Sequence, residues 1–179
     1  MNVIMKTLVA FFVLSELTLS AGATHQARQN QMACPAPYYG MGNGDGVLDW
    51  PCFELQKRLS LAAFRGQTTK IKQLLRRGAN VNSYAGDYLP PLFGAAAEGH
   101  TTAVRLLLDN GAEMNHKYTL NGTPLFAAVD ARHTGVVALL ISRGVDVNVH
   151  NGDDTCLKTA KAKGFTDIVT LLKNAGARE

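Results

Sequence analysis

Apolar and polar positions in the second half of the chain follow a pattern that predicts pairs of short helices. Residues 121–148 show it most clearly. Thr123 before Pro124 predicts a helix start, because the threonine hydroxyl can accept an unpaired backbone N–H and proline lacks the N–H that a first turn leaves free. A polar break at residues 132–133 separates this helix from a second one with a single apolar face. Gly144 is expected to end the second helix, since glycine adopts the left-handed conformation without a Cβ clash.

The same unit recurs along the chain with a period of 33 residues. A fourth, shorter copy begins at Thr155 and ends at Gly176, with one residue fewer between Asn148 and Thr155. The period therefore indicates one helix-turn-helix unit repeated along the chain. The repeated positions are Gly78, Gly111 and Gly144; Asn82, Asn115 and Asn148; Pro91 and Pro124; Ile71, Val104, Val137 and Val169; and Leu74, Leu107, Leu140 and Leu172.

Short motifs inside these units match a known family. They are Pro-Leu at 91–92, Ala-Ala at 95–96, Gly-His at 99–100, Gly-Ala at 111–112, Thr-Pro-Leu at 123–125 and Gly-Ala-Asn-Val-Asn at 78–82. From Cys52 to Ala177 the chain therefore resembles the ankyrin repeat family. The resemblance implies an all-α repeat solenoid of four stacked ankyrin helix-turn-helix units with hairpin-like loops. We expect the ankyrin repeat domain at 52–179, with units at about 52–82, 83–115, 116–148 and 149–179.

The two ends of the array are expected to differ from its middle. The first helix, from about Pro51, is predicted to cap the array with Leu55, Leu59 and Ala62 as its buried stripe. At the other end, Lys173 stands where the earlier copies carry an apolar residue. Terminal repeats need a polar outer face, so Lys173 indicates the last unit.

Residues 1–23 have the pattern of a secretory signal peptide. A weakly positive start at 1–6 precedes an apolar run at 8–14, and Ala21-Gly22-Ala23 fits the small-x-small cleavage rule. The alternative is an uncleaved membrane anchor, but Glu16 interrupts the apolar run well short of the roughly 20 residues that span a bilayer. We therefore expect a mature chain from Thr24 that is periplasmic or secreted, without a stable membrane span.

Export would place the cysteines in an oxidising compartment. Cys34 and Cys52 flank a loop rich in Gly, Pro and Tyr, and we expect them to form a disulfide that ties the N-terminal arm, residues 24–51, to the first helix. A bridge over so short a loop contributes about 3 kcal/mol in the chain-entropy estimate. Cys156 is left over at a helix start, where a packed thiol is favoured over a reactive nucleophile.

Charge and chemistry exclude several classes of function. The chain has 179 residues and a net charge of +4, with its Lys and Arg residues dispersed rather than gathered with aromatics, which argues against nucleic-acid binding. No set of nucleophile, acid-base pair and metal ligands is evident, so we expect no enzyme activity and no cofactor. His116 and His150 lie in loops between units, but no Cys or carboxylate joins them at ligand spacing, so a metal site is disfavoured. We expect a monomer.

A stack of helix pairs forms a concave face from its first helices and loop tips, where partners of ankyrin-like proteins dock. Tyrosine and arginine often anchor interfaces, although these tyrosines could instead pack between adjacent loops. The middle of the face is small and acidic, which favours a basic or protruding partner element. The partner-binding candidates are Phe64, Arg65, Glu98 and Asp130 at first-helix ends, beside Ala97, Ala131, Ala162 and Lys163, and Tyr84, Asp87, Tyr88, His116, Lys117, Tyr118, His150 and Asp153 at loop tips.

The resemblance and the export signal together predict an exported, non-enzymatic module that binds another protein. One role is that of an immunity or inhibitor protein that blocks a toxin enzyme. Two alternatives are an accessory protein in periplasmic oxidative-stress defence and a secreted effector that acts on host proteins. By the same resemblance, His100 and His133 are expected to serve helix packing and hydrogen bonding rather than chemistry.

Overall fold

The computed structural model describes residues 50–82, 85, 88–118 and 122–178, all within the unit of the chain bounded by Pro35 and Glu179. These residues form eight α-helices and one two-stranded antiparallel sheet, which confirms the predicted all-α solenoid of four helix pairs. The elements are α2 (Trp50–Phe64), α3 (Thr68–Arg76), α4 (Pro91–Ala97), α5 (Thr101–Asp109), α6 (Pro124–Asp130), α7 (Thr134–Ser142), β1 (His150–Asn151), β2 (Asp154–Thr155), α8 (Cys156–Ala162) and α9 (Thr166–Asn174).

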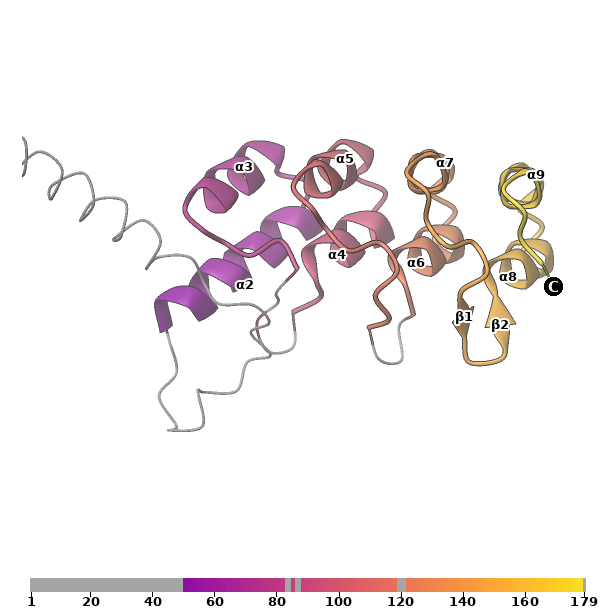
Figure 1. Ribbon diagram of the computed structural model, residues 1–179, viewed down its shortest axis with the longest axis horizontal. Coiled ribbons are helices and arrows are strands. Elements are labelled where there is room, and N and C mark those ends of the chain that lie inside the picture. Colours follow the sequence, from indigo (N-terminus) through magenta and orange to yellow (C-terminus); the bar gives the residue numbers. More distant parts are fainter. Residues whose placement is uncertain (1–49, 83–84, 86–87, 119–121, 179) are drawn as a thin grey trace, which may run out of the picture. The chain divides into compact units, whose positions relative to one another are not determined.

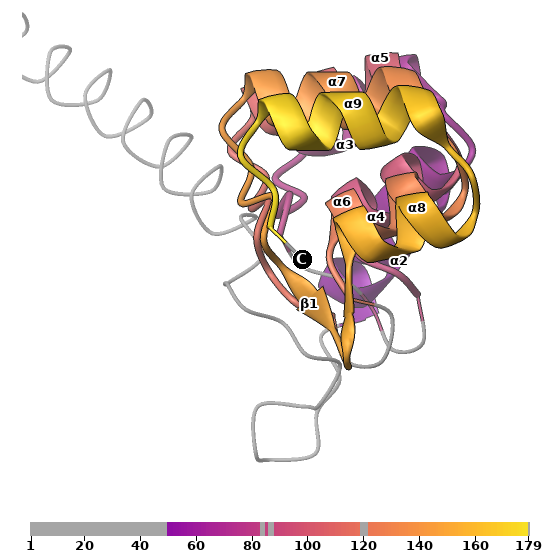
Figure 2. The ribbon, with the colours of Figure 1, turned by 90° about the vertical axis from the view of Figure 1, so that its right-hand side faces the viewer.

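The helices are arranged in two layers. Along the stack, α2, α4, α6 and α8 lie side by side in one layer, and α3, α5, α7 and α9 lie in the other (Figure 1). Figure 2, viewed along the stack, shows the two layers facing each other and the loop regions extending from the first-helix layer. Each first helix therefore contacts its own partner helix and the first helices of the neighbouring units.

Helix starts follow the predicted capping chemistry. The Thr123 hydroxyl accepts a hydrogen bond from the Phe126 backbone N–H (3.2 Å), and Pro124 occupies the first helical position of α6. Thr155 caps α8 in the same way, accepting from the Lys158 N–H at 3.1 Å. These bonds satisfy backbone donors that would otherwise be unpaired at the first turn.

The second helices end at the repeated glycines. Gly78, Gly111, Gly144 and Gly176 all adopt positive φ, between 82° and 89°. The residue after each glycine donates its N–H back to the helix, as Ala112 does to the Leu107 carbonyl at 3.1 Å. A left-handed residue followed by this bond closes a helix C-terminus and turns the chain toward the next unit.

A continuous hydrophobic core runs through the stack between the two layers. The predicted second-helix positions are buried: Ile71, Val104 and Val137 are each 0% exposed. Val169 is half-buried, because in the described chain no unit follows α9 to cover it. At the other end of the stack, Leu59 and Ala62 of α2 are buried and Leu55 is partly buried, which confirms the predicted stripe.

The repeated asparagines connect neighbouring units. The Asn82 side chain accepts from the Glu113 N–H (2.9 Å) and donates to the Gly111 carbonyl (3.1 Å). Asn115 accepts from the Asp146 N–H (3.0 Å), and Asn148 accepts from the Arg178 N–H (2.8 Å). A bond repeated at each junction fixes the loops of one unit against those of the next.

Lys173 is exposed on α9, as expected for the outer face of a terminal unit.

At the other end, the amide of Gln56 is fully buried on α2. When the Gln56 amide is oriented with its nitrogen toward the Asn80 carbonyl, that nitrogen donates to the Asn80 carbonyl oxygen (3.0 Å). The amide oxygen then accepts from the Asn80 backbone N–H (2.8 Å). Within the described ranges, no helix combines the length and hydrophobicity needed to cross a membrane.

Candidate partner-binding surface

The ends of the four first helices form a row along the stack. Phe64, Ala97, Asp130 and Ala162 are the last residues of α2, α4, α6 and α8. Because these helices lie side by side, their final residues and the residue after each one lie along one edge of the first-helix layer (Figure 1). This helix-end row comprises residues 64–65, 97–98, 130–131 and 162–163.

Phe64 is the residue of the row best suited to bury apolar area. Its side chain is 41% exposed, and within the described chain it is the one large hydrophobic residue classed as exposed. The Phe64 Cβ lies 3.6 Å from the position that a Cβ on Gly94 would occupy. Phe64 therefore packs against α4 at a residue that has no side chain. Arg65, next to it, is also exposed.

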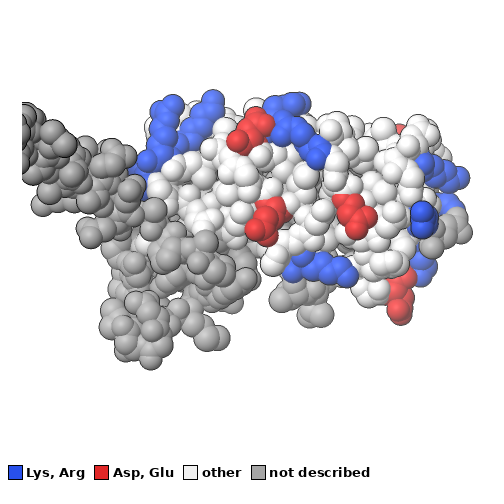
Figure 3. Space-filling view, viewed as in Figure 1, with Lys and Arg blue, Asp and Glu red and all other residues white. Residues whose placement is uncertain are grey.

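The charges of the row are partly neutralised within the protein. The Lys163 ammonium lies 2.6 Å from a carboxylate oxygen of Asp130 and 2.9 Å from the Asp130 carbonyl oxygen. The predicted acidic middle of the face is therefore reduced to Glu98, which is exposed and has no ion-pair partner among the described residues. On the face shown in Figure 3, basic side chains are spread along the stack and acidic ones lie singly among them.

Two histidines connect the helix-end row to the following units through contacts with backbone carbonyl oxygens. The His100 Nε2 lies 3.0 Å from the Phe64 carbonyl oxygen, and the His133 Nε2 lies 2.9 Å from the Ala97 carbonyl oxygen. The His133 ring also packs on Gly99, where a Cβ would come within 2.4 Å of it. Both histidines therefore join consecutive units, in agreement with the packing role that the family resemblance implied.

The third junction uses different residues at the same positions. Arg132 occupies the place of Gly99 and adopts a positive φ of 60°, which is uncommon for a residue with a side chain. Its guanidinium carbon lies 5.1 Å from the centre of the Phe165 ring, which stands where the second and third units carry His100 and His133. A cation–π contact thus replaces the glycine–histidine contact.

The loop tyrosines differ in how far they are accessible. Tyr118 is 8% exposed, and its ring contacts Phe93 edge-on (5.9 Å between centroids) and His116 (4.7 Å). Such burial favours, for Tyr118, the alternative that it packs between loops. Tyr88 is half-buried beneath Lys57, whose ammonium lies 5.6 Å from the ring centre. Tyr84 and Asp87 lie outside the described residues.

The remaining loop candidates, His116, Lys117, His150 and Asp153, are exposed. The His116 Nδ1 lies 3.6 Å from a carboxylate oxygen of Glu113, and the Asp153 carbonyl oxygen accepts from the Lys158 ammonium at 3.4 Å. In the described part of the chain, no group of three or more His, Cys, Asp or Glu side chains could hold a metal ion.

The cysteines provide no nucleophile on this surface. Cys156 is a free thiol, 0% exposed at the start of α8, and burial raises its pKa to about 12. A buried, protonated thiol is a poor nucleophile, which agrees with the packing role predicted for it. Cys52 is buried on α2, whereas Cys34 lies outside the described residues, so their disulfide stays a prediction.

Comparison with known families identifies the repeats. Residues 59–151, more than half of the 179-residue chain, match the family described as Ankyrin repeats (3 copies). The chain belongs to the ankyrin repeat family. Ankyrin repeats are protein–protein interaction modules and are typically non-catalytic, and no enzyme family matches the chain. No curated protein matches it either.

The structure extends the ankyrin array beyond the matched residues. The helices α8 and α9 follow residue 151 and repeat the geometry of the earlier pairs, including the threonine cap and the left-handed glycine at position 176. The described array therefore has four ankyrin units. The helix-end row crosses all four units.

Proposed function

We propose that this protein is exported and binds a partner protein through the helix-end row, together with the exposed loop residues His116, Lys117 and His150. The observation that carries the proposal is the exposed Phe64 ring, which has Arg65 beside it and the unpaired Glu98 on the next unit. Aromatic and arginine side chains are enriched among the residues that dominate binding energies. An aromatic ring flanked by unpaired charges of both signs offers apolar area together with polar contacts of defined direction.

The rigidity of the row supports this proposal. The carbonyl oxygens of Phe64 and Ala97 are held by histidines of the following unit, and Lys163 clamps Asp130. Association is weakened by the loss of conformational freedom, so a surface that is already ordered loses less on binding. The backbone that carries Phe64 is therefore already held in place before a partner binds.

The role we propose is that of an immunity or inhibitor protein that blocks a toxin enzyme. An interaction module without chemistry acts by covering or holding its partner, and covering an active site is sufficient to inhibit an enzyme. An accessory protein in periplasmic oxidative-stress defence and a secreted effector acting on host proteins would use the same surface. The buried Cys156 does not favour a redox reaction by the protein itself.

Export is the second part of the proposal, and the pattern of residues 1–23 supports it. These residues lie outside the described part of the structure. The intact mass of the protein recovered from its own cells tests this step: a chain that begins at Thr24 supports cleavage after Ala23. A full-length chain retained in the cytoplasm contradicts it.

Capture from the cell envelope tests the binding surface and separates the roles. The wild-type protein, the double variant Phe64→Ser/Arg65→Ala and the control Arg105→Ala are each immobilised, and bound proteins are identified by mass spectrometry. Arg105 is an exposed arginine of α5, away from the row. We expect one stoichiometric partner on the wild type and the control but not on the double variant.

The identity of that partner decides the role. A toxin enzyme supports inhibition, a peroxide-degrading enzyme the accessory role, and a host protein the effector role. Equal capture by all three proteins would contradict the helix-end row as the binding surface.

A further inference from the structure

A second surface lies on the first unit, in the groove between α2 and α3. It encloses a cavity of about 640 Å³ that is open to solvent. Five of its lining residues are cationic, namely Arg58, Arg65, Lys70, Arg76 and Arg77, and none is acidic. In the described part of the chain, Arg58 pairs with Glu54 at 2.8 Å, whereas the other four have no ion-pair partner.

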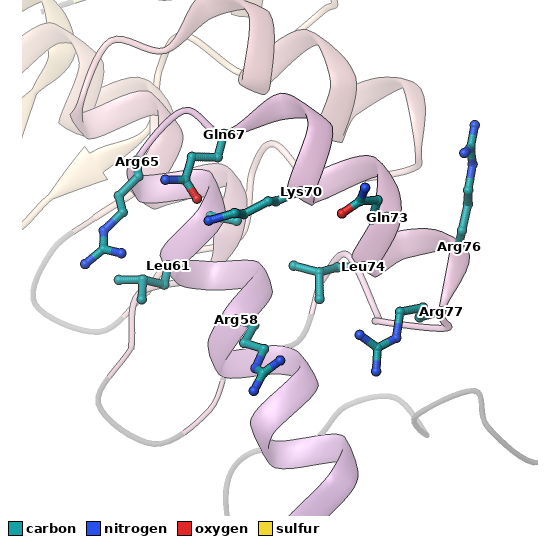
Figure 4. Close-up of a pocket in the computed structure, with 10 residues that line it drawn as sticks. Arg58, Leu61, Arg65, Gln67, Lys70, Gln73, Leu74, Arg76 and Arg77 are labelled. Carbon is teal, nitrogen blue, oxygen red and sulfur yellow. The ribbon is translucent and has the colours of Figure 1, made fainter.

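The floor of this basic groove is apolar. Leu61 of α2 and Leu74 of α3 both line the groove, and Lys70 extends from α3 toward α2 (Figure 4). The Arg76 guanidinium points away from the centre, which leaves Arg58, Arg65, Lys70 and Arg77 around the opening (Figure 4). An occupant of the groove would meet aliphatic side chains below and cations at the rim.

The repeat register shows how the first unit differs from the others. Lys70 stands at the position of Ala103, Val136 and Ile168, which are each 0% exposed. In the later units, this position packs within the core of the stack. In the first unit, a cation takes its place on the outer face, where no described unit precedes α2 and α3.

The need to keep a terminal unit soluble explains why these positions are polar. It does not explain why all the charged side chains are cationic. A polar cap can be built from either sign, and the C-terminal unit carries Asp167 as well as Lys161, Lys163 and Lys173. Unpaired cations held close together repel each other, so the arrangement is unfavourable until an anionic group approaches. The groove is therefore electrostatically complementary to an acidic ligand.

We propose that the basic groove docks an acidic segment of a protein partner, as a site distinct from the centre of the helix-end row. Carboxylates of that segment would pair with Lys70, Arg77 and Arg65, and its apolar side chains would contact Leu61 and Leu74. Arginine forms two parallel bonds with a carboxylate, which gives such pairing direction as well as charge. Arg65 belongs to both surfaces, so one partner can contact them together.

A protein segment fits this groove better than a nucleic acid does. Binding of single-stranded nucleic acid relies on aromatic rings that stack on bases, and none of the residues lining the groove in the described chain is aromatic. Leucine side chains and the amides of Gln67 and Gln73 instead match a peptide with alternating apolar and polar groups.

Fluorescence anisotropy with a synthetic probe tests the proposal without the natural partner. The probe is a labelled, amphipathic peptide of Glu and Leu, and a peptide with Lys in place of every Glu is its control. We expect the purified protein to bind the Glu/Leu peptide, and to bind it less tightly as salt rises, because screening weakens exposed charge pairs. Absence of Glu/Leu binding, or equal binding of the Lys/Leu peptide, would overturn the proposal.

Two matched variants locate the site. Lys70→Glu/Arg77→Glu reverses two charges of the groove, and Lys72→Glu/Arg105→Glu makes the same change in net charge at exposed positions that do not line it. We expect the first to raise the peptide Kd by about tenfold or more and the second by about twofold or less, since local pairing outweighs long-range charge. Equal effects in both variants would show that net charge alone attracts the peptide.

Two further probes exclude other occupants. A labelled oligonucleotide that binds more tightly than the peptide, with the same dependence on Lys70 and Arg77, would assign the groove to nucleic acid and overturn the proposal. A synthetic peptide of residues 35–49 that binds more tightly would assign it to the chain's own N-terminal segment, with the same consequence. Circular dichroism melting of each variant confirms that the comparison is made between folded proteins.

The two proposals fail independently. The groove variants leave Phe64 and Glu98 unchanged, and the peptide assay does not involve the captured partner. Loss of partner capture by the single variant Phe64→Ser, which leaves every residue lining the groove unchanged, would support the row regardless of the groove. Peptide binding in the absence of any captured partner would support the groove regardless of the row.

Discussion

At the residue scale, a few positions hold conformations that other side chains could not adopt. Gly99 combines a positive φ of 75° with close packing of the His133 ring. Either feature alone disfavours a side chain at residue 99. Together they explain why a glycine of one unit packs against a histidine of the next unit at this junction. Arg132 shows the one described exception, with a positive φ that is accompanied by contact with Phe165.

Substituting Gly99→Ala should therefore destabilise the protein. The left-handed conformation and the displaced His133 ring together should lower the free energy of unfolding by about 2 kcal/mol or more. Gly135→Ala is the matched control, because Gly135 lies inside α7 with helical backbone and the nearest atom to an added Cβ is 3.4 Å away. Chemical denaturation should show that the control has an unchanged or higher free energy of unfolding. Equal free energies of unfolding for the two variants would contradict the assigned packing of Gly99.

The Cys156 thiol should resist alkylation in the folded protein. Burial raises its pKa to about 12, so at neutral to mildly alkaline pH the reactive thiolate is scarce as well as inaccessible. Mass spectrometry after iodoacetamide treatment should show Cys156 unmodified in the native protein and modified in denaturant. Rapid labelling of native protein would contradict the burial and reopen a chemical role.

At the scale of elements, hydrogen bonds between units define how helix pairs stack. The Asn82 side chain makes two bonds to the next unit, at residues 111 and 113, and the Asn82 backbone N–H donates to the side-chain oxygen of Asn80. Because the loops carry part of the proposed binding surface, the asparagine contacts also position polar groups that a partner would meet.

Asn82→Ala should lower the free energy of unfolding by about 1 to 2 kcal/mol, since two partly exposed hydrogen bonds are lost and a backbone donor and acceptor remain without them. Asn174→Ala, at the exposed end of α9, should change stability little. Urea titration of both variants measures the difference. An Asn82 variant as stable as the control would show that the loops do not depend on this bridge.

The α7–α9 junction should make the protein sensitive to acid. The Thr134 hydroxyl donates to an Asp167 carboxylate oxygen at 2.7 Å, and this bond, followed by backbone N–H bonds, lowers the pKa of Asp167 below its ordinary value of 3.8. A lowered folded-state pKa means that the carboxylate stabilises the fold above the unfolded-state pKa, and that this contribution is lost as pH falls through the folded-state pKa.

Asp167→Asn should therefore reduce the fall in melting temperature between about pH 5 and pH 2, because the titrating group is removed. Thr134→Ala should flatten the same part of the profile, since it removes the main cause of the shift. Scanning calorimetry across this range provides the comparison. Unchanged acid profiles in both variants would contradict a role for this contact in acid stability.

At the scale of the whole molecule, the sequence predicted what repeats within one unit. Threonine caps, left-handed glycines and apolar faces are local patterns, and Thr123, Gly144 and Leu140 all lie as expected. The fold class followed from the resemblance of the 33-residue repeats to the ankyrin family, whose units bury their apolar faces by stacking.

Contacts between units were harder to predict, because they depend on how far each helix pair is offset from the next. The burial of Tyr118, the Asp130–Lys163 pair and the Arg132–Phe165 contact each join residues from two units. Opposite charges one period apart, as at 130 and 163, provide a signal that sequence alone could have used. The basic groove also left a signal, since Arg58, Leu61 and Arg65 are spaced to lie on one helix face.

The most direct test of the account is the affinity of the captured partner for the helix-end row. Isothermal titration should compare the wild type with Phe64→Ser/Arg65→Ala and with Arg105→Ala. Loss of an aromatic and an arginine anchor should raise the Kd by about thirtyfold or more, which corresponds to roughly 2 kcal/mol, while the control should differ by less than about twofold. An unchanged Kd in the double variant would contradict the claim that the ends of the first helices bind the partner.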